Sequence, residues 1–211
     1  MATLQTLVND AAKEIPNLTW QEYHEHYADK GYEYVKGTAI KMSPIHLRHE
    51  LMVSYLRYLF MTYFSFRDVG LIVGKPFQIK LSDINVTREP DLMFISNASF
   101  QRLHDTFLEG PADICIEIIS PGSIDIDHGQ KFSEYERGKV SEYWIIDPLR
   151  DETRFYRLNE QGVYIPQKTD EQGNYRTSAL PDFVLNVATL WLEKLPNGIE
   201  IMQAVREMVG A

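Results

Sequence analysis

The run DICIEII, at residues 113–119, constrains the fold of this chain more than any other segment. Its apolar residues are continuous and mostly β-branched, which is typical of a strand that is covered on both faces of a sheet. Glu117 interrupts the run, and an unpaired carboxylate costs several kcal/mol to bury. The fold must therefore bring Glu117 to a metal ion, a cation or a cleft. The simpler alternatives are an ordinary salt bridge to Lys131 or Arg137, or a position on a solvent-facing edge.

The N-terminal segment predicts two helices and a hairpin. Residues 1–14 are typical of a short polar helix, and Thr19 and Glu22 have the spacing of a capping box at the start of a second helix. The sequence YEYVKGTAIKM, at 32–42, alternates on both sides of a Lys-Gly pair and predicts a β-hairpin.

A long helix is expected over about residues 45–66, after Pro44. Apolar residues fall on nearly all of its sides. This pattern is typical of a helix that is buried on two sides or that forms a subunit interface. The helix therefore makes a homodimer one expectation for this chain.

The rest of the chain predicts short strands and helices. They are strands at 71–81, 91–95 and 142–147, a short helix at 98–104 capped by Asn97, a hairpin within 154–167, and an amphipathic helix at 199–209 that docks on the body. A capping-box spacing that begins at Asp127 and a terminating Gly138 predict a helix over 128–137. This helix carries Lys131 and Tyr135 one turn apart.

The order of these elements indicates an α/β or α+β fold with a mixed sheet, and not a series of regular βαβ repeats. The 211 residues fit a single domain, 1–211, because the sequence contains no internal repeat, low-complexity tract or linker.

Composition excludes several kinds of site. The single cysteine, Cys115, excludes an intrachain disulfide and a cysteine-based zinc site, and its place in an apolar strand indicates core packing. No signal peptide or membrane span is expected, because the most apolar segment, 51–66, contains Arg57 and is too short to cross a bilayer. We expect a protein of the reducing cytoplasm, because the chain has a single cysteine. No phosphate-binding glycine loop, GxSxG elbow, HExxH helix or GxGxxG motif occurs.

The net charge of −9, from 21 basic and 30 acidic residues, bears on possible partners. Proteins that hold nucleic acid tightly and nonspecifically usually carry the opposite charge, because neutralising phosphates supplies most of that affinity. An acidic chain can still act on DNA through a local basic surface and a metal ion.

Asp91 lies at the start of a second apolar run, EPDLMFI, and its meaning depends on Glu117. Taken alone, an acidic residue after proline is more typical of a strand start or a turn. If the two strands are neighbours, the carboxylates converge and raise one another's pKa unless a cation lies between them. Mg²⁺, which prefers oxygen ligands and keeps several waters, fits such a pair.

Other charged residues are weaker candidates. Lys131 can be a solvated helix residue, as most lysines are, or its ammonium can stabilise charge that develops on a phosphate. His49, early in the long helix, is expected at most to contact a residue of the site and not the metal or the substrate itself. The loop residues Asp125, Asp127 and His128 resemble a metal loop in composition, but capping and turn formation explain them more simply.

Several motifs together resemble the Uma2-like family, formerly a domain of unknown function, in the PD-(D/E)XK restriction-endonuclease-like superfamily. The motifs, which cover about residues 20–190, are YEYVKGTAIKMSP followed by His49, EPDLMFI, IEIISPGS, and the string from Lys131 through Tyr135 and Gly138 to EYWIIDP. The resemblance implies a restriction-endonuclease-like core, in which helices flank a central mixed sheet and the active site lies where strands splay apart. The predicted N-terminal hairpin and the C-terminal β structure then become additions to this core, and the terminal helices become appendages.

The resemblance also implies roles for individual residues. Asp91 and Glu117 correspond to the metal-binding acids of the superfamily. The lysine of the motif belongs at position 119, where this chain has Ile119, and in Uma2-like sequences Lys131 takes its place from the following helix. His49 and Tyr135 are expected to support the site, and the expected cofactor is Mg²⁺ or Mn²⁺.

Two functions follow from these expectations. The first is a metal-dependent endonuclease that hydrolyses phosphodiester bonds in DNA, in which Asp91, Glu117 and a main-chain carbonyl near Ile118 hold the metal and Lys131 stabilises charge. The second is a non-catalytic module that keeps the nuclease fold to bind protein or nucleic acid, which the acidic charge favours. The complete set of two acids and a lysine favours the enzyme, because a decayed enzyme has no chemical need for all three.

Overall fold

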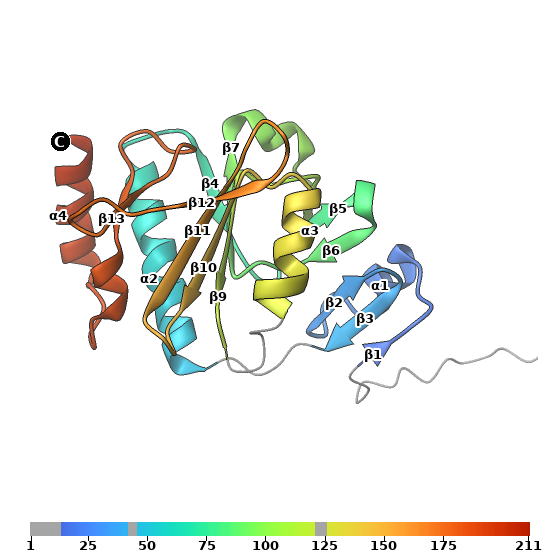
Figure 1. Cartoon of the computed structure of the whole chain (residues 1–211). Helices are drawn as coiled ribbons and strands as arrows, with labels where there is room; N and C mark the ends of the chain where they lie inside the picture. The colour runs from blue at the N-terminus through green and yellow to red at the C-terminus, as the bar shows by residue number, and fades with distance from the viewer. Residues whose placement is uncertain (1–13, 42–45, 121–125) are drawn as a thin grey trace, which may run out of the picture.

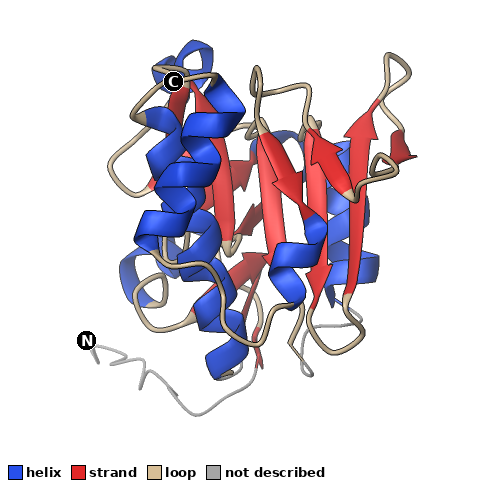
Figure 2. Cartoon of the chain, turned by 90° about the vertical axis from the view of Figure 1, so that its left-hand side faces the viewer, coloured by secondary structure: helices blue, strands red, loops and turns tan. Residues whose placement is uncertain are grey.

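The computed structural model describes residues 14–41, 46–120 and 126–211. Helices α2 and α4 cover one face of a six-stranded main sheet, and helix α3 and a second six-stranded sheet lie on its other side (Figure 1). Figure 2 views the same arrangement from the side of α4, with helices standing in front of the strands. This is the predicted mixed sheet flanked by helices.

The main sheet is mixed, and the strand that carries Glu117 is at its centre. In spatial order its strands are β12 (Tyr164–Gln167), β11 (Glu152–Leu158), β10 (Glu142–Asp147), β9 (Ile114–Ile118), β7 (Leu92–Ser96) and β4 (Gly70–Val73). Strands β9 and β10 are parallel, and the other neighbouring pairs are antiparallel. All five residues of β9 are buried, so the prediction of a strand covered on both faces is confirmed.

The second sheet contains the predicted hairpin. In spatial order its strands are β1 (Glu14–Ile15), β3 (Thr38–Lys41), β2 (Tyr32–Val35), β6 (Val86–Arg88), β5 (Gln78–Leu81) and β8 (Phe107–Glu109). Helix α1 (Trp20–His26) begins at the predicted capping box, because the Thr19 hydroxyl accepts a hydrogen bond from the Glu22 N–H. The polar helix predicted over 1–14 lies outside the described residues except for Glu14, which belongs to β1.

The predicted strand over 71–81 is wrong, because these residues form two strands in different sheets. Strand β4 belongs to the main sheet and β5 to the second sheet. Between them the chain turns at Gly74, where a Cβ atom would lie 2.1 Å from the Asp91 main-chain oxygen. Pro76 follows and has no N–H for a ladder hydrogen bond. The crossing places Lys75 between the two sheets.

The helix predicted over 128–137 begins earlier than expected. A π-helical segment, η3 (Ile126–Lys131), precedes α3 (Phe132–Arg137), so Asp127 lies within the helical segment and is not its cap. A π turn contains more residues than an α turn. The capping-box pattern assumes α-helical spacing, so it placed the start of the helix too late. The helix ends at Gly138, as predicted.

Other differences concern short elements. The short helix predicted at 98–104 is present over 97–102, but Asn97 does not cap it. A 3₁₀ helix, η2 (Asn97–Arg102), starts at Asn97, whose side-chain amide donates to the Asp68 carbonyl. Short elements that the sequence did not predict are β6, β8, β13 (Asn174–Arg176), β14 (Val184–Asn186), η1 (Ser82–Ile84) and η4 (Val187–Trp191). The predicted hairpin within 154–167 is confirmed as β11 and β12.

Helices α2 (Leu47–Phe64) and α4 (Gly198–Val209) enclose the larger apolar core against the main sheet. Phe60 of α2 stacks on Phe183, with ring centroids 4.7 Å apart. Ile201 and Val205 of α4 are buried, so the predicted docking of the C-terminal helix is confirmed. Within the described ranges, no helix has the length and apolarity that crossing a bilayer requires.

Candidate active site

Asp91 and Glu117 lie at facing positions of neighbouring strands. Leu92, the first residue of β7, pairs with Ile116 of antiparallel β9, so the residue before Leu92 and the residue after Ile116 occupy the next register position. Facing residues of an antiparallel pair point to the same side of a sheet. The two predicted acids are therefore on one face of the main sheet. An apolar cluster that includes Met93, Cys115 and Tyr135 of α3 covers the same face.

Glu117 is buried and receives two partners from the helix that follows. Its side chain is 1% exposed. Lys131 Nζ lies 3.0 Å from Glu117 Oε1, and the Tyr135 hydroxyl donates a 2.9 Å hydrogen bond to the same oxygen. The salt bridge to Lys131 is therefore present, and a solvent-facing edge position is excluded. The structure brings Lys131 to Glu117 although position 119 is occupied by Ile119.

Asp91 is also buried among partners of opposite charge. Its Oδ2 lies 3.0 Å from His49 Nε2 and accepts a 2.7 Å hydrogen bond from the Ile118 N–H. Lys75 Nζ lies 3.0 Å from Asp91 Oδ1. Burial raises the pKa of the Asp91 carboxyl, but the hydrogen bond from His49 and the nearby ammonium groups outweigh it. The pKa of Asp91 is therefore well below its ordinary value, and the group is ionised.

A third carboxylate, Glu33 of β2, completes the cluster. Glu33 Oε1 lies 3.7 Å from Lys131 Nζ, and Glu33 Oε2 accepts a 2.8 Å hydrogen bond from Arg88 Nη1. Arg88 also donates through Nε to Glu134 Oε2, at 2.8 Å. Burial raises the pKa of Glu33, but Lys131, Arg88 and Lys75 lower it more, to about 2. The cluster thus spans both sheets and α3.

Glu89 differs from the other acids of this region. Burial is the largest influence on its carboxyl and raises its pKa to about 7, against a hydrogen bond from Gln78 that lowers it. The negative charge of Glu33 raises the pKa of Glu89 further. Glu89 therefore exchanges a proton near neutral pH, while Asp91 and Glu33 stay ionised.

All five residues that the sequence predicted for the site lie in this cluster. His49 contacts Asp91, and Tyr135 contacts Glu117, as supporting residues would. Sequence reasoning did not identify Lys75, Glu33 or Arg88 as members. Glu33 had a weak signal in the sequence, because it stands between two tyrosines in the first strand of the predicted hairpin.

Lys75 and Arg88 had signals of a different kind. Lys75 lies between a glycine and a proline, a pattern that reads as an ordinary turn. Arg88 opens the sequence Arg-Glu-Pro-Asp, which also reads as a polar turn before a strand. Yet Arg88, Glu89 and Asp91 are all buried. A run of polar or turn-forming residues that begins at the end of one strand and reaches the start of the next can therefore mark a buried polar site.

The donor set at Asp91 and Glu117 fits a hard divalent cation. Asp91 Oδ1 is buried and accepts no hydrogen bond from the described residues, although Lys75 lies beside it as an ion pair. Mg²⁺ is commonly held by one or two carboxylates, with waters and substrate phosphate completing its shell. Among the described residues no group of three or more His, Cys, Asp or Glu is arranged to hold a metal. The candidate loop that includes Asp125 and Asp127 lies outside the residues whose side chains are described.

Comparison with solved structures supports the nuclease-like fold. The chain is similar to a protein from Anabaena variabilis described as "a putative nuclease belonging to DUF820", with a TM-score of 0.63 and 16% identity. The match covers 76% of this chain and 89% of the other. At this identity the likeness establishes the fold alone. No curated protein matches the chain in sequence.

The sequence itself matches a family model. The model is Uma2, described as "Putative restriction endonuclease", and it matches residues 20–188. That range contains both sheets except β1, together with every residue of the cluster at Asp91 and Glu117. The resemblance inferred from the motifs is thus confirmed, and the chain belongs to the Uma2 family.

Proposed function

We propose that this protein is a metal-dependent endonuclease that hydrolyses phosphodiester bonds in DNA, with Mg²⁺ or Mn²⁺ as its cofactor. One observation carries the proposal: Asp91 and Glu117 lie at facing strand positions, with the Lys131 ammonium 3.0 Å from Glu117. Family membership points to the same chemistry, because the matching family model is described as "Putative restriction endonuclease".

Asp91 and Glu117 are the residues that would hold the cation. A carboxylate binds a metal ion in its ionised form. The pKa of Asp91 is below its ordinary value, so this carboxylate is already ionised before a cation binds. A bound divalent cation lowers the pKa of an attacking water and polarises the phosphate. The Ile118 N–H and His49 fix the Asp91 carboxylate through Oδ2, which leaves Oδ1 as the oxygen for a ligand.

Lys131 and Lys75 supply positive charge where the phosphate would arrive. Lys131 is held between Glu117 and Glu33, so its ammonium is positioned before substrate binds. Preorganised charge of this kind stabilises the negative charge that develops on the phosphate oxygens. Lys75 is partly exposed and lies on Asp91 Oδ1, so it can move from that oxygen to a phosphate when a cation binds.

The test uses isosteric changes of the two acids. Asp91→Asn and Glu117→Gln remove the charge with little change of shape. Cleavage of plasmid DNA in the presence of Mg²⁺ or Mn²⁺ should fall by more than about 100-fold in each variant, because loss of the cation forfeits several kcal/mol of stabilisation. Circular dichroism and thermal unfolding report whether each variant remains folded.

A matched control comes from the other end of the same strand run. Asp113 accepts hydrogen bonds from Ser96 and lies away from the cluster, so Asp113→Asn should keep full cleavage activity. Chelation of divalent ions should abolish wild-type cleavage. Undiminished cleavage by both folded variants at Asp91 and Glu117 would refute the assignment of the site.

The rival function, a non-catalytic module, has one observation in its favour. Lys75, Lys131 and Arg88 already compensate the charges of Asp91, Glu117 and Glu33 without any metal ion. Calorimetric titration with MnCl₂ separates the two functions without relying on activity. If wild type releases or absorbs heat on binding Mn²⁺ and Glu117→Gln does not, the enzyme is supported. If wild type shows no Mn²⁺ binding, or binds Mn²⁺ as Glu117→Gln does, the module is favoured.

A further inference from the structure

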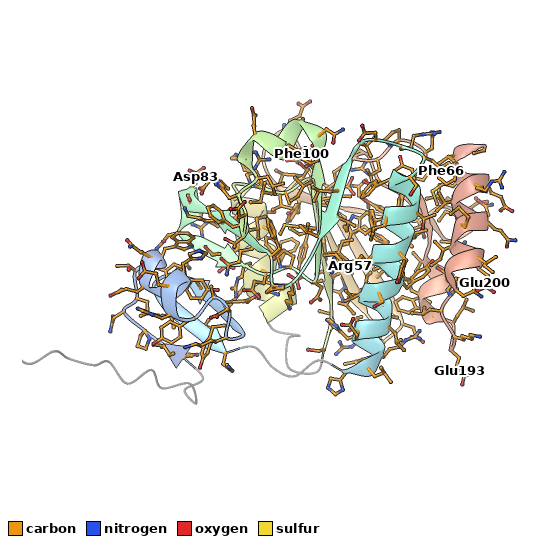
Figure 3. The ribbon with its side chains drawn as sticks, turned by 180° about the vertical axis from the view of Figure 1, so that it is seen from behind. Arg57, Phe66, Asp83, Phe100, Glu193 and Glu200 are labelled. Carbon is orange, nitrogen blue, oxygen red and sulfur yellow. The ribbon has the colours of Figure 1, made fainter. Side chains whose placement is uncertain are left out.

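Helix α2 has two apolar faces, and only one of them packs on the body of the protein. The inward face carries His49, Met52, Leu56, Leu59, Phe60 and Tyr63, which are buried. The opposite face exposes four large apolar side chains: Leu47 (74%), Leu51 (47%), Tyr58 (62%) and Met61 (53%). Figure 3 looks onto this face, with α2 in front, Arg57 on one side and α4 on the other.

The exposed residues follow the spacing of a coiled-coil seam. With Ser54 at the centre, Leu47, Leu51, Ser54, Tyr58 and Met61 are separated by steps of four, three, four and three residues. This is the alternation of the d and a positions of a heptad, which forms a continuous stripe along one side of a helix. A single isolated apolar residue on a surface needs no explanation, but a stripe of this length does.

The stripe is close to symmetric about Ser54: Leu47 and Met61 lie seven residues from it, whereas Leu51 lies three residues before it and Tyr58 four residues after it. An antiparallel copy placed around a twofold axis at Ser54 brings Leu47 opposite Met61 and Ser54 opposite Ser54, and it brings Leu51 within one residue step of the position opposite Tyr58. A twofold interface requires this kind of self-complementary surface. The small serine at the centre lets the two helix backbones approach closely.

The charges beside the stripe are complementary in the same arrangement. Glu50 and Arg57 occupy the g positions, which face each other across an antiparallel pair. Glu50 of one copy therefore lies opposite Arg57 of the second copy, and the twofold axis repeats this pair. Arg57 forms no ion pair with any residue in the described ranges, and its guanidinium lies beside Gly74, where a Cβ atom would be 2.8 Å from Arg57 Nη2.

A groove next to the stripe provides room for the tyrosine. Its volume is about 620 Å³, and Leu51, Tyr58, Leu195 and Pro196 are among its lining residues. Because the twofold pairing places Tyr58 of the second copy against Leu51, the tyrosine ring lies at this groove. Exposed Ile199 and Met202 on α4 continue the apolar surface beyond α2.

From these features we infer that the outer face of α2 binds a second copy of this chain, as an antiparallel α2–α2 homodimer centred on Ser54. The face that carries His49 points inward, so the dimer leaves the candidate active site of each copy intact. The inference is independent of the proposed nuclease activity.

The test is sedimentation of the full chain over a range of concentrations up to about 100 μM. Wild type should sediment as a dimer, with twice the 24.5 kDa mass of one chain. Tyr58→Glu should sediment as a monomer, because it places two charges in the apolar seam. Glu50→Arg and Arg57→Glu should each raise the dimer dissociation constant by about tenfold, because each creates two like-charge pairs.

The double variant with both charge reversals gives the sharpest result. It restores opposite charges across the axis, so its dissociation constant should return to within about threefold of wild type. Leu149→Glu is the control, because Leu149 is an exposed apolar residue outside this face. It should leave the dimer unchanged. Circular dichroism checks that each variant is folded.

Three outcomes overturn the inference. Wild type that stays monomeric at the highest concentration excludes the dimer. A dimer that persists in Tyr58→Glu places the contact elsewhere on the chain. If the dimer dissociation constant of the double variant is as high as that of the single reversals, the antiparallel register is rejected, even if the stripe contributes to binding.

Discussion

At the scale of single residues, Arg88 shows why charged side chains inside this protein were hard to assign from the sequence. Arg88 is 1% exposed and bridges Glu33 and Glu134. These partners are 55 and 46 residues away in the chain. Neither separation follows from a local pattern, because helix and strand periods relate only near neighbours. Glu117 could be identified because its apolar surroundings were visible in the sequence itself.

Glu142 of β10 is a second buried acid whose partners are distant, and it makes the stability depend on pH. It accepts hydrogen bonds from Tyr175, Trp144 and Ser178, and Arg157 Nε lies 3.0 Å from its Oε1. Burial raises the pKa of Glu142, but these hydrogen bonds outweigh it and leave the pKa below its ordinary value. The folded state therefore favours the ionised carboxylate.

We expect the contribution of Glu142 to be present above the pKa of the unfolded chain, about 4.3, and to be lost as the pH falls through the lower pKa of the folded state. Urea unfolding of wild type and Glu142→Gln between pH 7 and pH 3 measures it. The variant should be less stable at pH 7. The difference in free energy of unfolding between wild type and the variant should become smaller at low pH. It should change by at most about 1.4 kcal/mol per pH unit, the value for one proton.

Glu160→Gln, in the exposed turn between β11 and β12, is the control for removing a carboxylate and should follow wild type at every pH. A difference between wild type and Glu142→Gln that stays constant from pH 7 to pH 3 would contradict the assignment of Glu142.

At the scale of elements, long periodic segments were predictable and short strands were not. The long helix α2 and strands β9 and β10 have enough residues for a pattern to emerge. Strands β6 and β8 have three residues each, and their pairing partners in the second sheet are set by tertiary contacts. The break within 71–81 was missed because both halves are apolar, and which sheet each joins depends on Gly74 and its approach to Asp91.

Helix α4 gives a prediction at this scale. Ile201 is 2% exposed and packs in the larger core, whereas Ile199 on the same helix is 73% exposed. Ile201→Ala should lower the free energy of unfolding by about 2–4 kcal/mol, because it removes buried methyl groups and leaves a cavity. Ile199→Ala should change it by less than about 0.5 kcal/mol. Urea titration followed by circular dichroism compares them.

Equal effects of these two changes would show that α4 does not dock through the buried stripe. A large effect at Ile199 with none at Ile201 would indicate that the helix is rotated about its axis.

At the scale of the whole molecule, the candidate site is assembled from segments far apart in the sequence. His49 comes from α2, Lys75 from the crossing between sheets, Asp91 and Glu117 from neighbouring strands, and Lys131 from the helical segment beneath them. The sequence predicted a subset of this site, because an acid in an apolar run and a motif resemblance are both local signals. Lys75 could not be predicted without the path of the chain between the two sheets. The catalytic roles remain predictions.

The position of Cys115 turns the single thiol of this protein into a reporter on its central strand. Cys115 is fully buried, and it lies two residues from Glu117 on the same face of β9. Burial and the charge of Glu117 raise the pKa of the Cys115 thiol well above its ordinary value. A thiol reagent can therefore react only when β9 opens, at a rate set by the free energy of that opening.

Labelling of the folded protein should be orders of magnitude slower than labelling in denaturant, and mass spectrometry follows both reactions. Any ligand held by Glu117 should slow labelling further, by a factor of one plus the ratio of ligand concentration to its dissociation constant. Rapid labelling of the folded protein would show that the strand opens readily. The thiol thus provides a kinetic measure of occupancy at the neighbouring acid that requires no substrate.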